Sequence, residues 1–308
     1  MDDSMPMSSA ASFLVAPAGS AFAAGDSEAG EAALWDIWNQ VVEYASQTPA
    51  HELDRVIEIL KVVADLEEPA TFEIWGKQAT WKQLPLLGPA IRESWDDERH
   101  AEPFNINAFA ARLTAANLVD LSMYAIWTLR SVLEDSIPSQ IYSKSGEKGC
   151  KAAAAWFIYA GKVLYAFCKE GRKFGGRGTE QGSDVVGEDW NGFNEARWRL
   201  WVERIEEVQR TVVDENTKKV LQKAMEEIQG ASEPDLWILT ESSVDRPVQQ
   251  AHTSICDDNI RFFDQFRINS FIDNHCTGTS EKRYSVAITN VGRRNPNVDL
   301  NAVVGEGS

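Results

Sequence analysis

Apolar side chains recur at helical spacing through most of this chain, from about residue 28 to residue 229. Such stripes, separated by short polar or Gly/Pro connections, are typical of helices that bury one face against their neighbours. We therefore expect an all-α protein, built as a multi-helix bundle or a helical-repeat-like array. The clearest stripe consists of Leu34, Trp38, Val41, Val42 and Ala45.

Further helices follow from the same spacing, from caps and from prolines. Pro49 ends the first helix, and a second stripe ends near Pro69, so this pair predicts an antiparallel helical hairpin. After this hairpin, the sequence indicates an aromatic-rich connection over 70–88 and a short helix after Pro89. Later helices are predicted over 107–118, 123–134 and 151–169, after Asn194 and after Asp214, with caps at Asn105, at Asp120 or Ser122, at Asn194 and at Asp214.

The segment 151–169 is the most apolar of these helices. It contains four consecutive alanines followed by Trp156, Phe157 and Ile158, with apolar residues on nearly every side. A helix of that kind is usually surrounded by others, so we expect it at the centre of the bundle. Before it, residues 138–149 indicate a Ser/Gly/Lys loop, and after it residues 171–192 indicate a Gly-rich loop that is a flexible cover or lid.

Both ends of the chain differ from the helical part. Residues 13–16 are apolar and small residues follow, as in a secretory signal, but the charged flank is Asp2-Asp3 and Pro17 interrupts the run. We expect residues 1–27 to be a disordered tail, residues 28–229 to be the helical domain, and residues 230–308 to be a poorly defined, partly disordered extension. In that extension, residues 260–272 could be a helix and 283–289 a strand.

The charge excludes several classes of partner. The formal net charge is −17, which disfavours nucleic acids and anionic membranes because both need a basic surface. No apolar run reaches the ~18 residues of a spanning helix. The four Cys are far apart, which favours a reducing compartment, and we expect a cytoplasmic protein.

Several short motifs resemble those of a known family. They are 34–39 (LWDIWN), 84–89 (LPLLGP) with Arg92 and Trp95, 105–114 (NINAFAARLT), 125–130 (AIWTLR), 154–161 (AAWFIYAG) and 192–201 (GF…RWRLW). Over about residues 34–229 the chain resembles a fungal family known only as a domain of unknown function (three-six-three-two). The resemblance implies an all-helical, cytoplasmic fungal protein, and it implies no catalytic residue.

One constellation could bind a ligand. Trp and Tyr rings form flat walls with a polar edge, and Arg offers a forked donor to a carboxylate or carbonyl. On facing helices these side chains would suit a flat or polycyclic small molecule, although aromatic residues at helical spacing are more often core. The 11 Trp of the chain fit either interpretation. The candidate residues are Asn107, Arg112, Tyr124, Trp127, Arg130, Trp156, Tyr159, Arg197, Trp198 and Trp201.

Other chemistries find little support in the sequence. His252, Cys256, His275 and Cys276 have poor spacing for zinc, and no metal or other cofactor is expected. No nucleophile elbow is present, and Gly176-Arg177-Gly178 followed by Gly182 lacks the strand and spacing of a dinucleotide loop. The pair Asp96-Asp97 lacks the basic partners of a diphosphate site.

The sequence therefore leaves two functional hypotheses. The first is a non-catalytic protein-interaction or scaffold domain, with a homodimer left open. The alternative is a cofactor-independent enzyme or binding protein for a fungal small-molecule metabolite, which would act through the aromatic and Arg residues by positioning and hydrogen bonding. A secreted effector is disfavoured by the N-terminal residues and the isolated cysteines.

Overall fold

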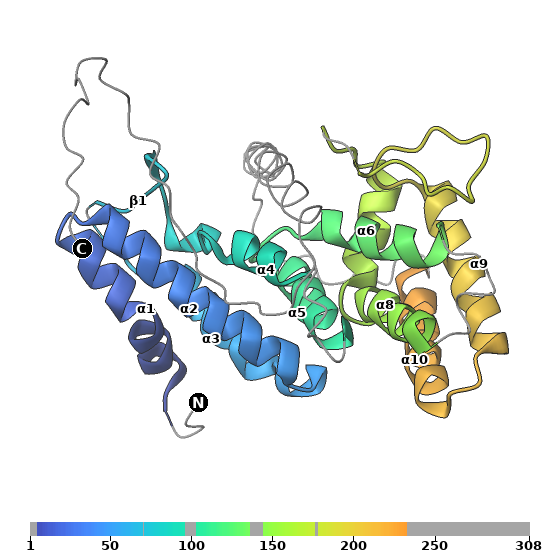
Figure 1. Cartoon of the computed structure of the whole chain (residues 1–308), viewed down its shortest axis with the longest axis horizontal. Helices are drawn as coiled ribbons and strands as arrows, with labels where there is room; N and C mark the ends of the chain where they lie inside the picture. The colour runs from blue at the N-terminus through green and yellow to red at the C-terminus, as the bar shows by residue number, and fades with distance from the viewer. Residues whose placement is uncertain (1–4, 70, 96–102, 136–143, 176–177, 233–308) are drawn as a thin grey trace, which may run out of the picture. The chain divides into compact units, whose positions relative to one another are not determined.

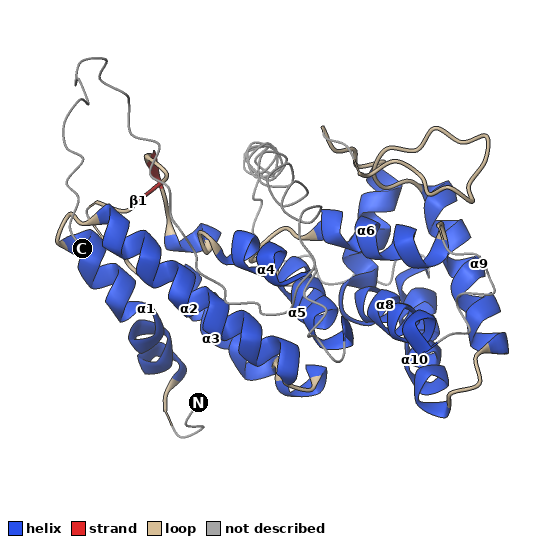
Figure 2. Ribbon diagram, viewed as in Figure 1, coloured by secondary structure: helices blue, strands red, loops and turns tan. Residues whose placement is uncertain are grey.

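A computed structural model describes residues 5–69, 71–95, 103–135, 144–175 and 178–232. All of them belong to the first of two units, Met1–Ile260. Within these ranges the chain forms nine α-helices and one two-stranded hairpin, which confirms the predicted all-α fold (Figure 1, Figure 2). The described residues end at residue 232. The rest of the predicted extension, including the candidate helix 260–272 and strand 283–289, lies outside them.

From the second helix onward, the helices follow the predicted order along the chain. The helices are α1 (Met7–Ala23), α2 (Ser27–Gln47), α3 (Asp54–Ala64), α4 (Leu87–Trp95), α5 (Pro103–Ala115), α6 (Ser122–Leu133), α8 (Lys144–Glu170), α9 (Glu195–Thr211) and α10 (Glu215–Ser232), with short 3-10 turns η1 (Ala50–Glu52) and η2 (Trp81–Gln83). None of these helices is both long and apolar enough to cross a bilayer.

Among the described elements, helix α8 makes its main helix contacts with α5, α6, α9 and α10, which confirms its predicted central position. Its alanines 152–155 are buried, and Ala155 clusters with the fully buried Ala108 of α5. Small side chains allow two helix backbones to approach closely, and the larger neighbours Trp156 and Phe157 fill the space beside them. The alanine run is therefore part of the packed interior of α8, and at Ala155 it meets α5.

The expected disordered tail is wrong for residues 7–23, because these residues form helix α1. Ala11, Val15, Ala18 and Phe22 recur every three or four residues, and all four are buried in the core. Pro17 lies inside the helix and does not end it. The helical stripe of mostly small residues is easily mistaken for a signal-like or low-complexity segment.

The position of α1 also corrects the predicted hairpin of α2 and α3. Helix α1 packs against both of them, more extensively than they pack against each other. The aromatic ring of Phe22 fits where Gly30 of α2 has no side chain, since a Cβ there would lie 2.5 Å from the ring. On its other side Phe22 meets Phe72 at 4.7 Å between centroids, and Phe72 meets Trp81 at 4.5 Å.

Two helix starts differ from those expected. Helix α5 begins at Pro103, a residue suited to the first turn, and Asn105 is not its cap but donates to the carbonyl of Ser46 at 3.2 Å. Helix α8 begins at Lys144, so the second half of the predicted loop 138–149 is helical. The predicted caps of α9 and α10 are confirmed: Asn194 accepts from the amide of Arg197 at 2.8 Å, and Asp214 from that of Thr217 at 2.7 Å.

The aromatic-rich connection folds into a hairpin and two tight turns. Strands β1 (Glu73–Ile74) and β2 (Lys77–Gln78) pair antiparallel, and Trp75 and Gly76 at the tip both have positive φ. Farther on, Leu84 and Leu86 adopt left-handed backbone angles although both are buried. The indole of Trp38 donates to the carbonyl of Pro85 between them at 2.7 Å, which holds this strained segment against α2.

The packing of α1 can be tested by two substitutions on the same helix. Phe22→Ala removes a fully buried ring, so the free energy of unfolding should fall by about 3–5 kcal/mol. Phe13→Ala changes a side chain that is 76% exposed, and should shift that free energy by less than about 0.5 kcal/mol. Urea unfolding of the full chain measures both, and equal effects would show that α1 does not belong to the core.

Candidate functional site

Glu134 and Arg197 form a buried ion pair between the end of α6 and the first turn of α9. Both side chains are completely inaccessible to solvent. The Nε of Arg197 donates to Oε1 of Glu134 at 2.7 Å, and Nη2 donates to Oε2 at 3.0 Å. Such a two-pronged contact fixes both the distance and the orientation of the two helices.

Every polar hydrogen of Arg197 has an acceptor. Besides the two bonds to Glu134, Nη1 donates to the carbonyls of Thr179 at 2.7 Å and Gly192 at 2.8 Å, and Nη2 to that of Glu180 at 3.0 Å. A guanidinium has five N–H groups, and all five are used. The side chain is therefore satisfied by the protein itself, with no donor left for a ligand.

The carboxylate of Glu134 is equally saturated. Its Oε1 also accepts from the indole of Trp201 at 2.6 Å, and its Oε2 accepts from the amide of Gly182 at 2.7 Å. The Trp201 ring lies edge-on to Phe193, with centroids 6.0 Å apart. Unpaired buried charges cost far more than hydrogen-bonded ones, so this network stabilises the fold only as a complete set. We call Glu134, Arg197, Trp201 and the backbone groups they bind the ion-pair hub.

The ion-pair hub holds the Gly-rich loop in place, which corrects its interpretation as a flexible cover. The loop returns on itself at Thr179 and Gly192, whose backbones pair at 3.0 Å. A Cβ on Gly182 would lie 2.4 Å from that of Glu134, and one on Gly192 would lie 2.2 Å from the carbonyl oxygen of Arg172. The glycines at these two positions therefore allow close packing of the loop.

Asn107 is the centre of a second buried polar cluster. Its Oδ1 accepts from the indole of Trp156 at 2.8 Å and from the hydroxyl of Thr128 at 2.9 Å, and its Nδ2 donates to the carbonyl of Pro103 at 2.9 Å. The three side chains come from α5, α8 and α6. Their polar atoms bind one another, so this cluster also ties helices together.

Arg112 and Tyr159 form a separate, partly exposed pair. The guanidinium lies 4.3 Å from the centre of the Tyr159 ring and forms an ion pair with Asp54. Lys223 of α10 approaches the same ring at 5.7 Å. The Nε of Arg112 is buried and has no hydrogen-bond partner among the described residues.

The remaining candidates lie in three further groups. Tyr124 contacts Trp127 at 4.9 Å between centroids, and Arg130 forms an ion pair with Asp135 at 3.3 Å. Trp198 contacts Phe157 at 5.5 Å and Tyr165 at 5.3 Å. The contacts of the ten predicted site residues thus distribute them among several small clusters, and they do not identify one shared cavity.

Asp120 and Arg172 form another ion pair, between the start of α6 and the end of α8. Burial alone would raise the pKa of the Asp120 carboxyl, but the charge of Arg172 and the hydrogen bonds from Ser122 outweigh burial and lower the pKa below its ordinary value of 3.8. The predicted cap of α6 at Asp120 or Ser122 is wrong, because Leu121 occupies the N-cap position and no side chain caps the helix. Asp120 instead accepts from the Ser122 amide at 3.0 Å.

The two described cysteines are poor nucleophiles. Burial, together with the charge of Glu147, raises the pKa of Cys150 to about 12, and burial raises that of Cys168 to about 12. A thiol must be ionised to attack, so both are inert near neutral pH. Among the described residues, no group of three or more His, Cys, Asp or Glu side chains could hold a metal, and the His252 to Cys276 cluster lies outside them.

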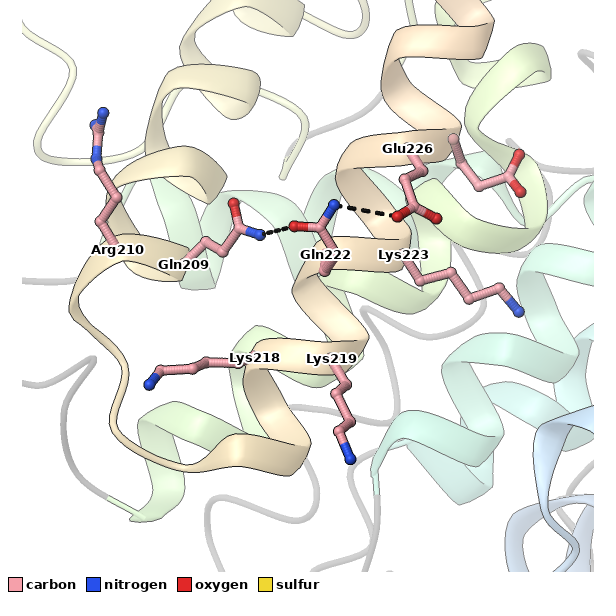
Figure 3. A pocket seen from close by; sticks show the side chains of 8 residues that line it. Gln209, Arg210, Lys218, Lys219, Gln222, Lys223 and Glu226 are labelled. Atoms are coloured by element: carbon pink, nitrogen blue, oxygen red, sulfur yellow. Dashed lines mark hydrogen bonds between the residues drawn. The ribbon is translucent and has the colours of Figure 1, made fainter.

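An open groove of about 610 Å³ runs between α9 and α10 on the surface (Figure 3). Gln222, an exposed lining residue on α10, accepts from Gln209 at 2.5 Å and donates to Glu226 at 3.1 Å. The lining carries four cations and two carboxylates, and we call it the α9–α10 groove. Its lining residues are Gln209, Arg210, Lys218, Lys219, Gln222, Lys223, Glu226 and Glu227.

Neither Glu134 nor the α9–α10 groove was predicted from the sequence. Glu134 is one of 47 acidic residues, and the only signal is its place directly after the strongly apolar helix α6. The groove residues look like an ordinary solvated helix face, because only the pairing of α9 with α10 brings them together.

The fold defines a mostly helical protein in which the candidate aromatic and Arg residues contact other side chains of the same chain. The chain belongs to the family described as Protein of unknown function (DUF3632), whose model matches residues 38–205 and so more than half of the sequence. This match confirms the family resemblance. No curated protein and no solved structure matches the chain.

A double-mutant cycle measures the strength of the ion-pair hub. Glu134→Leu or Arg197→Met alone leaves a buried charge without its partner and should lower the free energy of unfolding by about 3–5 kcal/mol. The double variant should lose less than the sum of the two, because neither charge remains. The free energies come from urea unfolding followed by circular dichroism.

The control cycle uses a second pair on α9, Arg204 and Glu207, which lie 3.5 Å apart at the surface. Arg204→Met and Glu207→Leu should each change the free energy of unfolding by less than about 1 kcal/mol. Additive losses at Glu134 and Arg197, without coupling, would contradict the hub.

Acid stability tests the Asp120 pair. Because the pKa of Asp120 is lower in the folded chain than its ordinary value of 3.8, the ionised form stabilises the fold above that pH. This contribution is lost as the pH falls through the lowered pKa. Asp120→Asn should therefore cost about 1.5–3 kcal/mol at pH 7 and flatten the decline of stability below about pH 4. Asp36→Asn, at an exposed carboxyl on α2, is the control, and identical pH profiles for the wild type and Asp120→Asn would refute the assignment.

Proposed function

We propose that this chain is a non-catalytic protein-interaction or scaffold domain of the fungal cytoplasm. The observation that carries the proposal is the saturation of Arg197, whose five donors bind only the protein's own Glu134 and loop backbone. Side chains that could have bound a ligand instead stiffen the junction of α6, α9 and the Gly-rich loop. A rigid helical body with open charged surface suits the docking of another macromolecule.

The cellular location and origin rest on other support. The net charge of −17 fits a soluble protein of the cell interior, and the sequence resemblance points to filamentous fungi. The α9–α10 groove supports a binding role because it is open and formed by long polar side chains. Such a surface resembles the polar rim of a protein interface more than an enclosed small-molecule site.

One observation favours the alternative, a small-molecule enzyme or binding protein. The buried Nε of Arg112 has no hydrogen-bond acceptor among the described residues, and the guanidinium lies over Tyr159. A carboxylate or carbonyl of a metabolite could supply that acceptor. Arg112 is therefore the residue on which the two proposals differ most.

Native mass spectrometry of the full chain, purified from a filamentous fungal host, separates the proposals. We expect the mass of the chain alone, or of a complex with a second protein that reassembles from purified components. A retained small molecule would contradict the interaction domain. The next step would compare Arg112→Met with the control Arg204→Met. If only Arg112→Met lost the added mass, the metabolite-binding alternative would replace the interaction domain as the proposed function.

A further inference from the structure

We propose that the α9–α10 groove binds a short acidic segment of a partner protein. This inference rests on the proposed function and adds the chemistry of the partner. Four cations, Arg210, Lys218, Lys219 and Lys223, are among the lining residues of one groove in a chain whose net charge is −17. Figure 3 shows their charged ends spread around the groove in different directions. A local concentration of positive charge against such a background marks a place where carboxylates are attracted.

The cations differ in what they already bind. Lys218 forms an ion pair with Glu215 at 2.8 Å, and Lys223 lies near the Tyr159 ring. Arg210 and Lys219 are exposed and have no ion pair within the part of the chain that the structure describes. These two side chains can turn to a partner without breaking an existing bond.

The dimensions of the groove limit the length of the segment. Its lining on α10 extends from Lys218 to Glu227, which is about 14 Å at the helical rise per residue. An extended chain covers that distance with about four residues. The site therefore fits a few consecutive carboxylates and not a long polyanion.

The charges at the far end oppose a longer anion. Glu226 and Glu227 line the groove one to two turns beyond Lys219 and Lys223, and Glu226 is tied to Gln222 at 3.1 Å. Nucleic acid carries charge along its whole length and would meet these carboxylates and the acidic surface beyond. A short acidic segment avoids that repulsion, which is why we favour a protein partner.

The two helices that form the groove are held together without a partner. Gln209 bonds to Gln222 across the two helices at 2.5 Å. Beneath them, Val208 and Leu221 are buried in the core, and Trp201 anchors α9 to the ion-pair hub. Because neither helix has to be ordered on binding, little conformational entropy opposes the partner.

The test uses a fluorescein-labelled hexaglutamate peptide and the full chain at low salt, followed by fluorescence anisotropy. Saturable binding is expected, weakened by added salt and absent for hexaglutamine. Lys219→Glu combined with Lys223→Glu should raise the Kd at least about tenfold, since two attractions become repulsions. Glu226→Gln should instead lower the Kd.

A matched control reverses two exposed lysines elsewhere, Lys82 on η2 and Lys148 on α8. Either pair of reversals changes two charges by two each and takes the net charge from −17 to −21. The control should change the Kd by less than about twofold. Circular dichroism of all variants shows whether each one still folds. The double variant Arg210→Gln/Lys219→Gln removes two positive charges without reversing them, and so helps to separate loss of binding from loss of fold.

Three results would overturn the inference. They are no saturable binding, equal losses in the groove and control variants, and equal or tighter binding of a six-nucleotide single-stranded DNA. If the reassembled partner complex kept its affinity in the Lys219→Glu/Lys223→Glu variant, the interaction domain would stand and this groove would not be its docking site. A retained metabolite would contradict the proposed function itself.

Discussion

The buried pair of Glu134 and Arg197 is the interaction on which the arrangement of α6, α9 and the Gly-rich loop depends. Two charges can stay away from water only where each hydrogen-bonding group has a partner. Here the partners are Trp201, the amide of Gly182 and the carbonyls of the loop, so the pair and the loop require each other. Such a pair contributes more to the specificity of the fold than to its net stability, because alternative packings would leave a charge unpaired.

The helices could be predicted from the sequence because burial of one helix face makes apolar residues recur every three or four positions. The prediction of a central α8 succeeded for the same reason, since its apolar residues surround the helix. Helix α1 was missed because Ala11 and Ala18 are small and Pro17 interrupts the stripe. The packing of α1 against both α2 and α3 could not be predicted, because periodicity shows which face is buried but not against which helix.

The candidate site was less predictable than the fold. The aromatic and Arg residues were expected on facing helices, and contacts such as those of Asn107 with Trp156 and of Arg112 with Tyr159 do join different helices. Their separation into small clusters depends on side-chain directions that spacing does not encode. The α9–α10 groove depends on which solvated faces lie side by side, and its charges have no pattern of their own in the sequence.

The distances along the chain between these contacts have a consequence for synthesis. Helices α1, α2 and α3 find one another within the first 64 residues, so this layer can assemble as soon as they are made. Glu134 can form its ion pair only after Arg197, which lies 63 residues later in the chain, has been synthesised. At about 5–20 residues per second, this delay lasts roughly 3–13 seconds, during which the end of α6 is without its partner. We infer that the chain folds in two stages during synthesis, and that the ion-pair hub forms in the second.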